Sequence, residues 1–229
     1  MAEPDAYDAE YFTTLYGASP RQTWADRKRD ARVVDLVRRY APPSGNGDAI
    51  LDVGCGFGYL LERFAGRFSL YGVDLSPVAV RASGLRLDGA VLAQANVEQG
   101  IPFRRLFQVV LAVNVIEHLP DPRAGVANIA RALTPGGLCV VHLPTVNNLL
   151  NRAIYRLTYA KDPTHVFRPS GDEVVSLFRS AGLALVEQSY APHVPRGLWN
   201  LLRAHPAYLA AFRRTRGSSS PASGIRGGR

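Results

Sequence analysis

The segment ILDVGCGFGYLL, residues 50–61, decides the fold, because an apolar run ends in an acid, enters a glycine-rich turn and continues into a helical pattern. Glycines let backbone N–H groups approach a ligand closely, and the start of a helix favours negative charge. Dinucleotide folds share this design, but the spacing here is G-x-G-x-G rather than G-x-G-x-x-G. Asp52, just before the turn, repels a pyrophosphate and suits an ammonium or sulfonium. The segment therefore predicts a ligand that is cationic at one end.

A second acid follows the next apolar run. Asp74 ends the predicted strand 69–73 and comes 22 positions after Asp52, where a carboxylate can accept both hydroxyls of a ribose. The alternative role for Asp74 is to cap the helix that begins near residue 77, but Ser76 already suits that position. We therefore favour the ribose role.

Short apolar runs alternate with helical patterns over most of the chain. The predicted strands are 49–53, 69–73, 90–93, 107–113, 138–143 and 183–188, and the predicted helices are 59–68, 77–85, 123–133 and 171–181. Continuous apolar strands separated by helices predict an α/β fold with a doubly wound, mostly parallel sheet. Ligands of such sheets bind beyond the carboxyl ends of the strands.

The two ends of the chain are expected to differ from this core, which spans residues 44–190. Residues 1–43 predict an N-terminal helical lid that ends at the break PPSGNG. No convincing seventh strand follows residue 188: either 208–212 is a poor one or the sheet ends early, so 191–212 is interpreted as a helical or partly stranded cover. The Ser-, Gly- and Arg-rich residues 213–229 predict a disordered basic tail.

Cysteine usage and the distribution of apolar residues indicate a cytoplasmic protein. Cys55 and Cys139 fit neither a disulfide framework nor a zinc site, which suggests a reducing compartment. The acidic residues 1–8 lack the pattern of a secretory signal, and no apolar run approaches the roughly 20 residues that cross a bilayer.

Four motifs occur in an order that identifies a family. The segments LDVGCGFG (51–58), GVDLS (72–76), VNVIEHLPDP (113–122) and LTPGG (133–137) resemble those of class I S-adenosylmethionine-dependent methyltransferases. The nearest branch is similar to the ubiquinone-biosynthesis O-methyltransferases, and the resemblance covers about residues 7–190. It implies a Rossmann-like fold, S-adenosylmethionine as cofactor and a small-molecule methyl acceptor.

The resemblance assigns a cofactor site. It implies that Gly54 and Gly56 pass beneath the methionine part, that Asp52 faces the amino group and that Asp74 holds the ribose. Asn96 stands where the family usually has Asp beside the adenine; its amide oxygen can still accept from the adenine amino group, or Asn96 is a turn residue. The remaining implied cofactor residues are Cys55, Leu75, Val97, Val113 and Asn114.

The acceptor side offers two histidines as candidate catalytic residues. His118 can act as a general base on a substrate hydroxyl, or it can be a structural residue of the turn. His165 lies in a loop with Asp162 and Arg168, which provide means to orient it. Related enzymes associate E-x-x-E-H with a divalent metal, but Asn114 replaces the first acid here, so we expect no metal.

These observations predict methyl transfer to a hydroxyl, or with less support an amine, of a small metabolite. The net charge of +8, from 27 basic and 19 acidic residues, motivates RNA methylation as an alternative, but no RNA-binding module or aromatic platform accompanies it. The charge lies mainly in the tail and in residues 27–39, which leaves an anionic substrate open. Another alternative is a membrane-associated or non-catalytic binder using 198–203 and 207–214. We expect a monomer or homodimer.

Overall fold

Seven strands form one sheet in this computed structural model, which describes residues 22–43, 45, 47–159, 162–190, 200–203 and 205–216. The strands are β1 (Ala49–Val53), β2 (Ser69–Asp74), β3 (Val91–Gln94), β4 (Phe107–Val113), β5 (Leu133–Pro144), β6 (Leu183–Ser189) and β7 (Ala207–Arg214). Their order is β3-β2-β1-β4-β5-β7-β6. Neighbouring strands are parallel except that β7 runs antiparallel to both β5 and β6. The predicted mostly parallel α/β sheet is confirmed.

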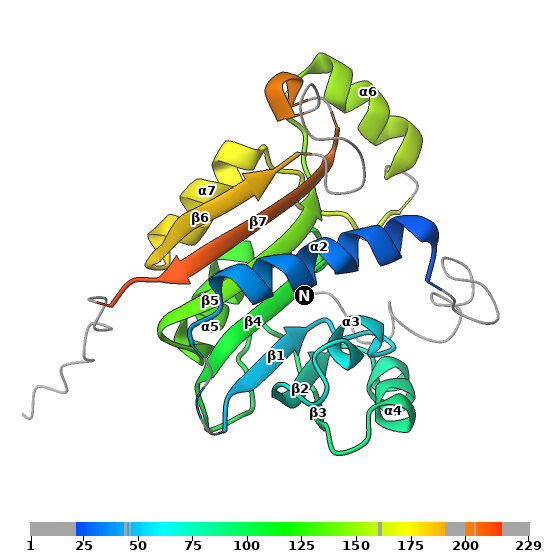
Figure 1. The fold of residues 1–229 in the computed structure, drawn as a ribbon. Coiled ribbons are helices and arrows are strands. Elements are labelled where there is room, and N and C mark those ends of the chain that lie inside the picture. Colours follow the sequence, from blue (N-terminus) through cyan, green and yellow to red (C-terminus); the bar gives the residue numbers. More distant parts are fainter. Residues whose placement is uncertain are drawn as a thin grey trace, which may run out of the picture.

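Helices cover both faces of the sheet (Figure 1). They are α2 (Trp24–Tyr40), α3 (Tyr59–Glu62), α4 (Pro77–Arg86), the 3₁₀ helix η2 (Ile116–His118), α5 (Pro122–Ala132), α6 (Leu149–Thr158) and α7 (Gly171–Ser180). Apolar side chains of α2 and α3 fill the core on one face. Side chains of α5 and α7 fill the core on the other face. Figure 1 shows α6 beyond the end of β5, away from these layers.

Local sequence signals explain where the helices begin. Thr23 caps α2 through a capping box, in which its hydroxyl accepts from the Asp26 amide and the Asp26 carboxylate accepts from the Thr23 amide. Ser76 caps α4 by a single bond, in which its hydroxyl accepts from the amide of Ala79. Ser170 and Glu173 form a second capping box at α7. These bonds satisfy amide groups that have no partner inside their helices.

Most predicted elements agree with the structure, and the helix that follows β1 is shorter than expected. The strands at 49–53 and 107–113 have the predicted bounds. The helix expected over 59–68 ends at Glu62, because the chain then turns through Gly66, which has a φ of 77°. The helical character expected of the lid is found in α2, Trp24–Tyr40; residues 1–21 of the expected lid lie outside the described residues.

Of the two alternatives for the C-terminal region, the strand is confirmed, but β7 is a complete inner strand of the sheet rather than a poor one or part of a cover. Residues 207–212 are all buried; Tyr208 and Phe212 pack with the core beneath α5 and α7, while Leu209 packs on the α2 side. A strand covered on both faces loses the alternation of polar and apolar residues that marks a half-exposed strand. Its three alanines also weaken the β signal.

The basic tail was predicted to begin at residue 213, but β7 continues to Arg214. Arg213 and Arg214 belong to β7, and the Arg213 guanidinium donates to the carbonyls of Gly136 and Tyr40. Residues 191–199 of the expected cover, and the expected tail from residue 217 onward, lie outside the described residues.

Candidate functional site

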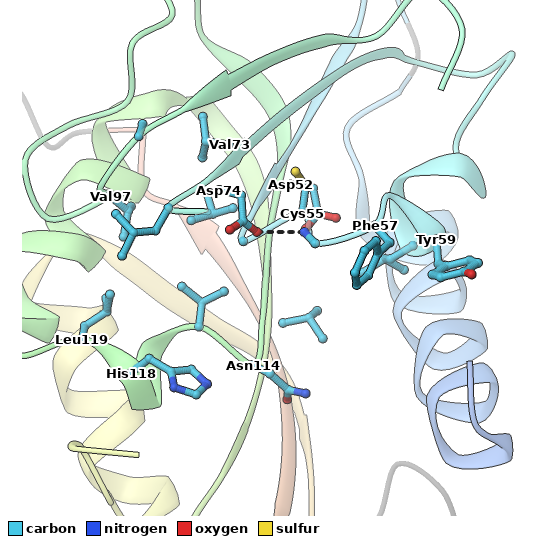
Figure 2. A pocket seen from close by; sticks show the side chains of 18 of the residues that line it. Asp52, Cys55, Phe57, Tyr59, Val73, Asp74, Val97, Asn114, His118 and Leu119 are labelled. Atoms are coloured by element: carbon cyan, nitrogen blue, oxygen red, sulfur yellow. Dashed lines mark hydrogen bonds between the residues drawn. The ribbon is translucent and has the colours of Figure 1, made fainter. Parts of the chain in front are cut away.

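A cavity of about 250 Å³ lies where β1, β2 and β4 end (Figure 2). The parallel register brings these carboxyl ends to one edge of the sheet, so residues distant in sequence meet there. All ten residues predicted to bind the cofactor line this cavity: Asp52, Gly54, Cys55, Gly56, Asp74, Leu75, Asn96, Val97, Val113 and Asn114. The structure therefore brings the predicted set together.

Asp74 joins the loops that follow β1 and β2. One carboxylate oxygen accepts from the Gly56 amide at 2.9 Å, the bond drawn in Figure 2, and the other accepts from the Ser76 amide at 2.9 Å. Burial raises the pKa of Asp74, although these amides oppose the change. Ser76 is the N-cap residue of α4, so the alternative role of Asp74 as the cap of that helix is not needed. Its carboxylate holds the glycine loop in place and borders the cavity.

The glycine loop needs glycine for two different reasons. Gly54 has a φ of 71°, and a Cβ there would stand 2.4 Å from a methyl of Val115. Gly56 has a φ of 53°, and a Cβ there would meet no protein atom within 4 Å. Gly54 thus allows close packing inside the protein. Gly56 leaves space in the cavity that a ligand can fill.

Carboxylates dominate the charge around the cavity. Five acids, Asp26, Asp30, Asp52, Asp74 and Glu98, line it together with one arginine, Arg29. Burial, and then the charges of Asp30 and Asp74, raise the pKa of Asp52 well above its ordinary value. A cationic group bound beside Asp52 would offset both the burial and the repulsion. In a chain of net charge +8, this acidic cavity favours a cationic ligand.

Helix α2 supplies cavity residues that the sequence analysis missed, namely Gln22, which precedes the helix, and Asp26, Arg29 and Asp30. Asp30 is fully buried and accepts from Arg29 Nε at 3.0 Å, while Arg29 Nη1 donates to Asp26 at 2.9 Å. A sequence signal existed, because Asp30 falls on the same helical stripe as Val33 and Val37. An acid inside an apolar stripe indicates a buried site.

The basic residues 27–39 lie on α2, where their charge is largely neutralised, and Arg29 among them lines the cavity. Arg32 and Arg39 pair with Asp35 on the same helix, and both also reach Glu187 on β6. These ion pairs attach α2 to the far edge of the sheet.

Asn96 takes the turn role that the sequence analysis left open. Its amide oxygen accepts from the Glu98 backbone at 2.9 Å, which tightens the turn after β3. Asn128 supports the same turn by donating to the carbonyls of Val97 and Glu98. Asn96 still lines the cavity, so its contact with an adenine remains a prediction.

Asn114 follows β4 in a left-handed conformation, with a φ of 56°. Its side-chain oxygen and His142 Nδ1 are 2.7 Å apart, so His142 is a hydrogen-bonded core residue rather than a catalytic one. Asn114 is thereby engaged away from Glu117.

A magnesium ion would find a poor set of ligands here. Among the described residues, Glu117, His118 and His165 bring donor atoms within 4.8 Å of one another, but this set has two imidazoles and one carboxylate. Magnesium prefers oxygen ligands. Burial also raises the pKa of Glu117 to about 8, which favours its protonated form at neutral pH. We therefore derive no step of the reaction through a metal.

His118 borders the cavity (Figure 2). A hydrogen-bond chain through Thr164 and Asp162 fixes its protonation pattern. Its Nδ1 lies 2.8 Å from Thr164 Oγ1 and 3.3 Å from the Thr164 carbonyl oxygen. Thr164 Oγ1 already donates its proton to Asp162 at 2.5 Å, so it accepts from His118 Nδ1–H. The Nε2 atom then carries the lone pair of the neutral ring. Burial, and then His165, lower the pKa of His118 to about 4, so the ring is neutral at pH 7.

His165 does not line the cavity but stands directly behind His118. The two ring centroids are 4.8 Å apart, and His165 Nδ1 lies 3.1 Å from the Tyr155 hydroxyl. His165 Nε2 is 3.6 Å from Asp162, the orienting acid that the sequence suggested. Direct contact of His165 with an acceptor stays a prediction.

Comparisons with known proteins agree with this geometry. A family model described as a methyltransferase domain matches residues 25–188. The ubiquinone biosynthesis O-methyltransferase of Xylella fastidiosa is 30% identical over 183 residues, covering 71% of this chain and 70% of that protein. The same enzyme from Psychrobacter arcticus is 34% identical, but the match covers only 59% of this chain and 56% of the relative.

A solved structure shows the same fold. The N-methyltransferase NodS from Bradyrhizobium japonicum, in complex with S-adenosyl-L-homocysteine, superposes with a TM-score of 0.59 and 20% identity, over 82% of this chain and 87% of that one. With the family match, the seven-stranded sheet and the acidic cavity at its carboxyl edge, the chain belongs to the class I S-adenosylmethionine-dependent methyltransferases.

Proposed function

We propose that the protein transfers a methyl group from S-adenosylmethionine to a hydroxyl of a small metabolite. The observation that carries the proposal is the acidic cavity, in which Asp52 and Asp74 border the glycine loop. This donor is cationic at both its ammonium and its sulfonium. The chain spans little more than half of the length of the Psychrobacter relative.

The residues fit the donor in a definite orientation. Asp52 binds the ammonium, because a buried carboxylate next to Asp30 gains most from a positive partner. Asp74 accepts the ribose hydroxyls with the lone pairs that the Gly56 and Ser76 amides leave. Val97 and Leu119 border the space for the adenine. When bound, the donor supplies an activated methyl group, so the protein mainly needs to align the acceptor.

His118 is the group that takes the acceptor proton. Its Nδ1–H is held by Thr164, and Nε2 carries the lone pair. A base whose conjugate acid has a pKa of about 4 is weak, so it works best on an acidic hydroxyl. This favours a phenolic hydroxyl over an aliphatic one. An amine acceptor is the second candidate.

The alternatives have less support. RNA binding is weakened because Arg29, Arg32 and Arg39 are paired with acids on α2 and β6. Membrane contact through residues 207–214 does not fit an inner strand. The described part of the chain contains no helix with the length and apolar character of a membrane span. A cytoplasmic location fits the two buried free thiols, Cys55 and Cys139.

Calorimetric titration with S-adenosylhomocysteine tests the donor site. We expect binding by the wild type, loss of binding by Asp74→Ala, and unchanged binding by Asp88→Ala, an exposed acid outside the cavity. A folded wild type that binds nothing would refute the proposal. Radiolabelled methyl transfer to a metabolite extract then identifies the acceptor, and light scattering decides between monomer and homodimer.

A further inference from the structure

A second cavity, of about 300 Å³, lies beside α6. Its lining consists of Val146, Arg152, Tyr155, Arg156 and Arg168, so three of the five lining residues are arginines. Arg152 and Arg156 stand four residues apart on α6 and therefore neighbour each other on one side of the helix. Arg168 comes from the loop that precedes α7 and completes the basic rim.

The part of the chain that the structure describes supplies no counter-ion for this concentration of charge. Within the described residues, none of the three arginines has a carboxylate partner, and all three are exposed. Arg168 donates from Nε to the His165 carbonyl, which aims its side chain without neutralising it. By contrast, Arg29, Arg39 and Arg203 each pair with an acid. Like charges four residues apart destabilise a helix, so an anion between them would be favourable.

A chain of side-chain contacts leads from this cavity to His118. Tyr155 lines the cavity, its hydroxyl is 3.1 Å from His165 Nδ1, and the His165 ring packs against that of His118. Side-chain bonds fix α6 in this position: Asn148 caps the helix through the Asn151 amide at 2.9 Å and donates to the Leu202 carbonyl at 3.0 Å. Figure 1 shows α6 beyond the end of β5.

We propose that Arg152, Arg156 and Arg168 form an anion subsite that binds a phosphate or carboxylate group of the methyl acceptor. The inference rests on the proposed function and adds a substrate class to it, namely acceptors that carry an anionic group apart from the reacting hydroxyl. Planar guanidinium groups match both anions through paired hydrogen bonds. Three of them favour phosphate, which brings up to two negative charges.

The test measures binding of inorganic phosphate by calorimetry at constant ionic strength. We expect millimolar-range or tighter binding by the wild type, weakened about tenfold or more in Arg152→Gln/Arg156→Gln, the effect of losing one hydrogen bond to a charged group. The matched control is Arg81→Gln/Arg123→Gln, which removes the same charge from exposed positions outside both cavities. Equal binding by both double variants, or no binding by the wild type, overturns the proposal.

Two further measurements distinguish the anion subsite from the donor site and from a lipid-headgroup site. Titration with S-adenosylhomocysteine is expected to give the same affinity in both double variants and in the wild type. If the wild type does not bind S-adenosylhomocysteine, the donor site is refuted. The anion subsite is judged separately, by comparing phosphate affinities of the wild type and the two double variants. Leu149 and Leu157 on α6 are also exposed, so flotation with phosphatidylglycerol vesicles is included. Binding of vesicles through Arg152 and Arg156, without binding of phosphate, would replace the acceptor subsite with a lipid-headgroup site.

Discussion

Asp52 lowers the stability of the ligand-free protein at neutral pH and, in the proposed function, binds the donor's ammonium. Its pKa is raised in the folded chain, so the native state holds its proton more tightly than the unfolded chain does. Stability from this group therefore falls as pH rises from the ordinary value of 3.8 through the raised folded value. At neutral pH ionisation of the buried Asp52 side chain lowers the free energy of unfolding, and a cationic ligand can offset this loss.

Asp52→Asn should therefore raise the melting temperature of the ligand-free protein and weaken S-adenosylhomocysteine binding. Relief of about 1 kcal/mol corresponds to roughly 2–4 °C in a chain of this size. We expect at least about tenfold weaker binding, or 1.4 kcal/mol. Thermal unfolding and calorimetry measure the two effects, with the exposed Asp88→Asn as control. Lower stability together with unchanged binding would contradict this role.

Gly56 allows a matched test of the cavity surface. Gly56→Ala and Gly66→Ala place a Cβ on backbones with φ of 53° and 77°, and neither Cβ meets protein atoms within 4 Å. Both changes should cost a similar backbone strain of about 1–2 kcal/mol. Only Gly56 lines the cavity, so only Gly56→Ala should weaken S-adenosylhomocysteine binding. Calorimetry of both variants checks this, and equal affinities would show that the space at Gly56 holds no ligand.

At the scale of elements, the sequence predicted what depends on local pattern. The strand ends that carry Asp52, Asp74 and Asn114 were found because apolar runs and following polar residues are contiguous in sequence. The contribution of α2 was missed because the contact of Asp30 with the cavity depends on how a helix crosses the sheet. Strand β7 was only a weak alternative at 208–212, because burial on both faces removes the periodicity that marks a strand.

The loop before α7 positions His118, a role that only the fold reveals. Thr164→Val removes the oxygen that accepts from His118 Nδ1–H, whereas Thr164→Ser keeps it. We expect Thr164→Val to lower kcat by about tenfold or more, in line with the contribution of a general base, and Thr164→Ser to restore most of it. Donor affinity should stay unchanged in both. Steady-state kinetics with S-adenosylhomocysteine calorimetry checks this, and equal kcat values would remove His118 from proton transfer.

At the scale of the whole molecule, α2 connects the cavity to the far edge of the sheet. One end of the helix places Asp26 and Asp30 at the cavity, and the other end is fastened to β6 through Glu187. Glu187 accepts from Arg39 at 2.6 Å and from the Tyr40 hydroxyl at 2.9 Å. The net charge of +8 therefore does not describe the site: the arginines of α2 are paired with acids, and the cavity is lined mainly by carboxylates.

Glu187→Gln should loosen α2 and lower the melting temperature at pH 7. The hydrogen bond from Arg39 lowers the pKa of Glu187, so its stabilisation is present above the ordinary value of 4.5 and is lost as pH falls through the lowered value. The difference between variant and wild type should shrink in that acid range, and also in high salt, because these groups are partly exposed. Thermal unfolding between pH 3 and 7 measures it. A difference that is constant across this range would mean that Glu187 acts through packing, and that α2 is held by its apolar face alone.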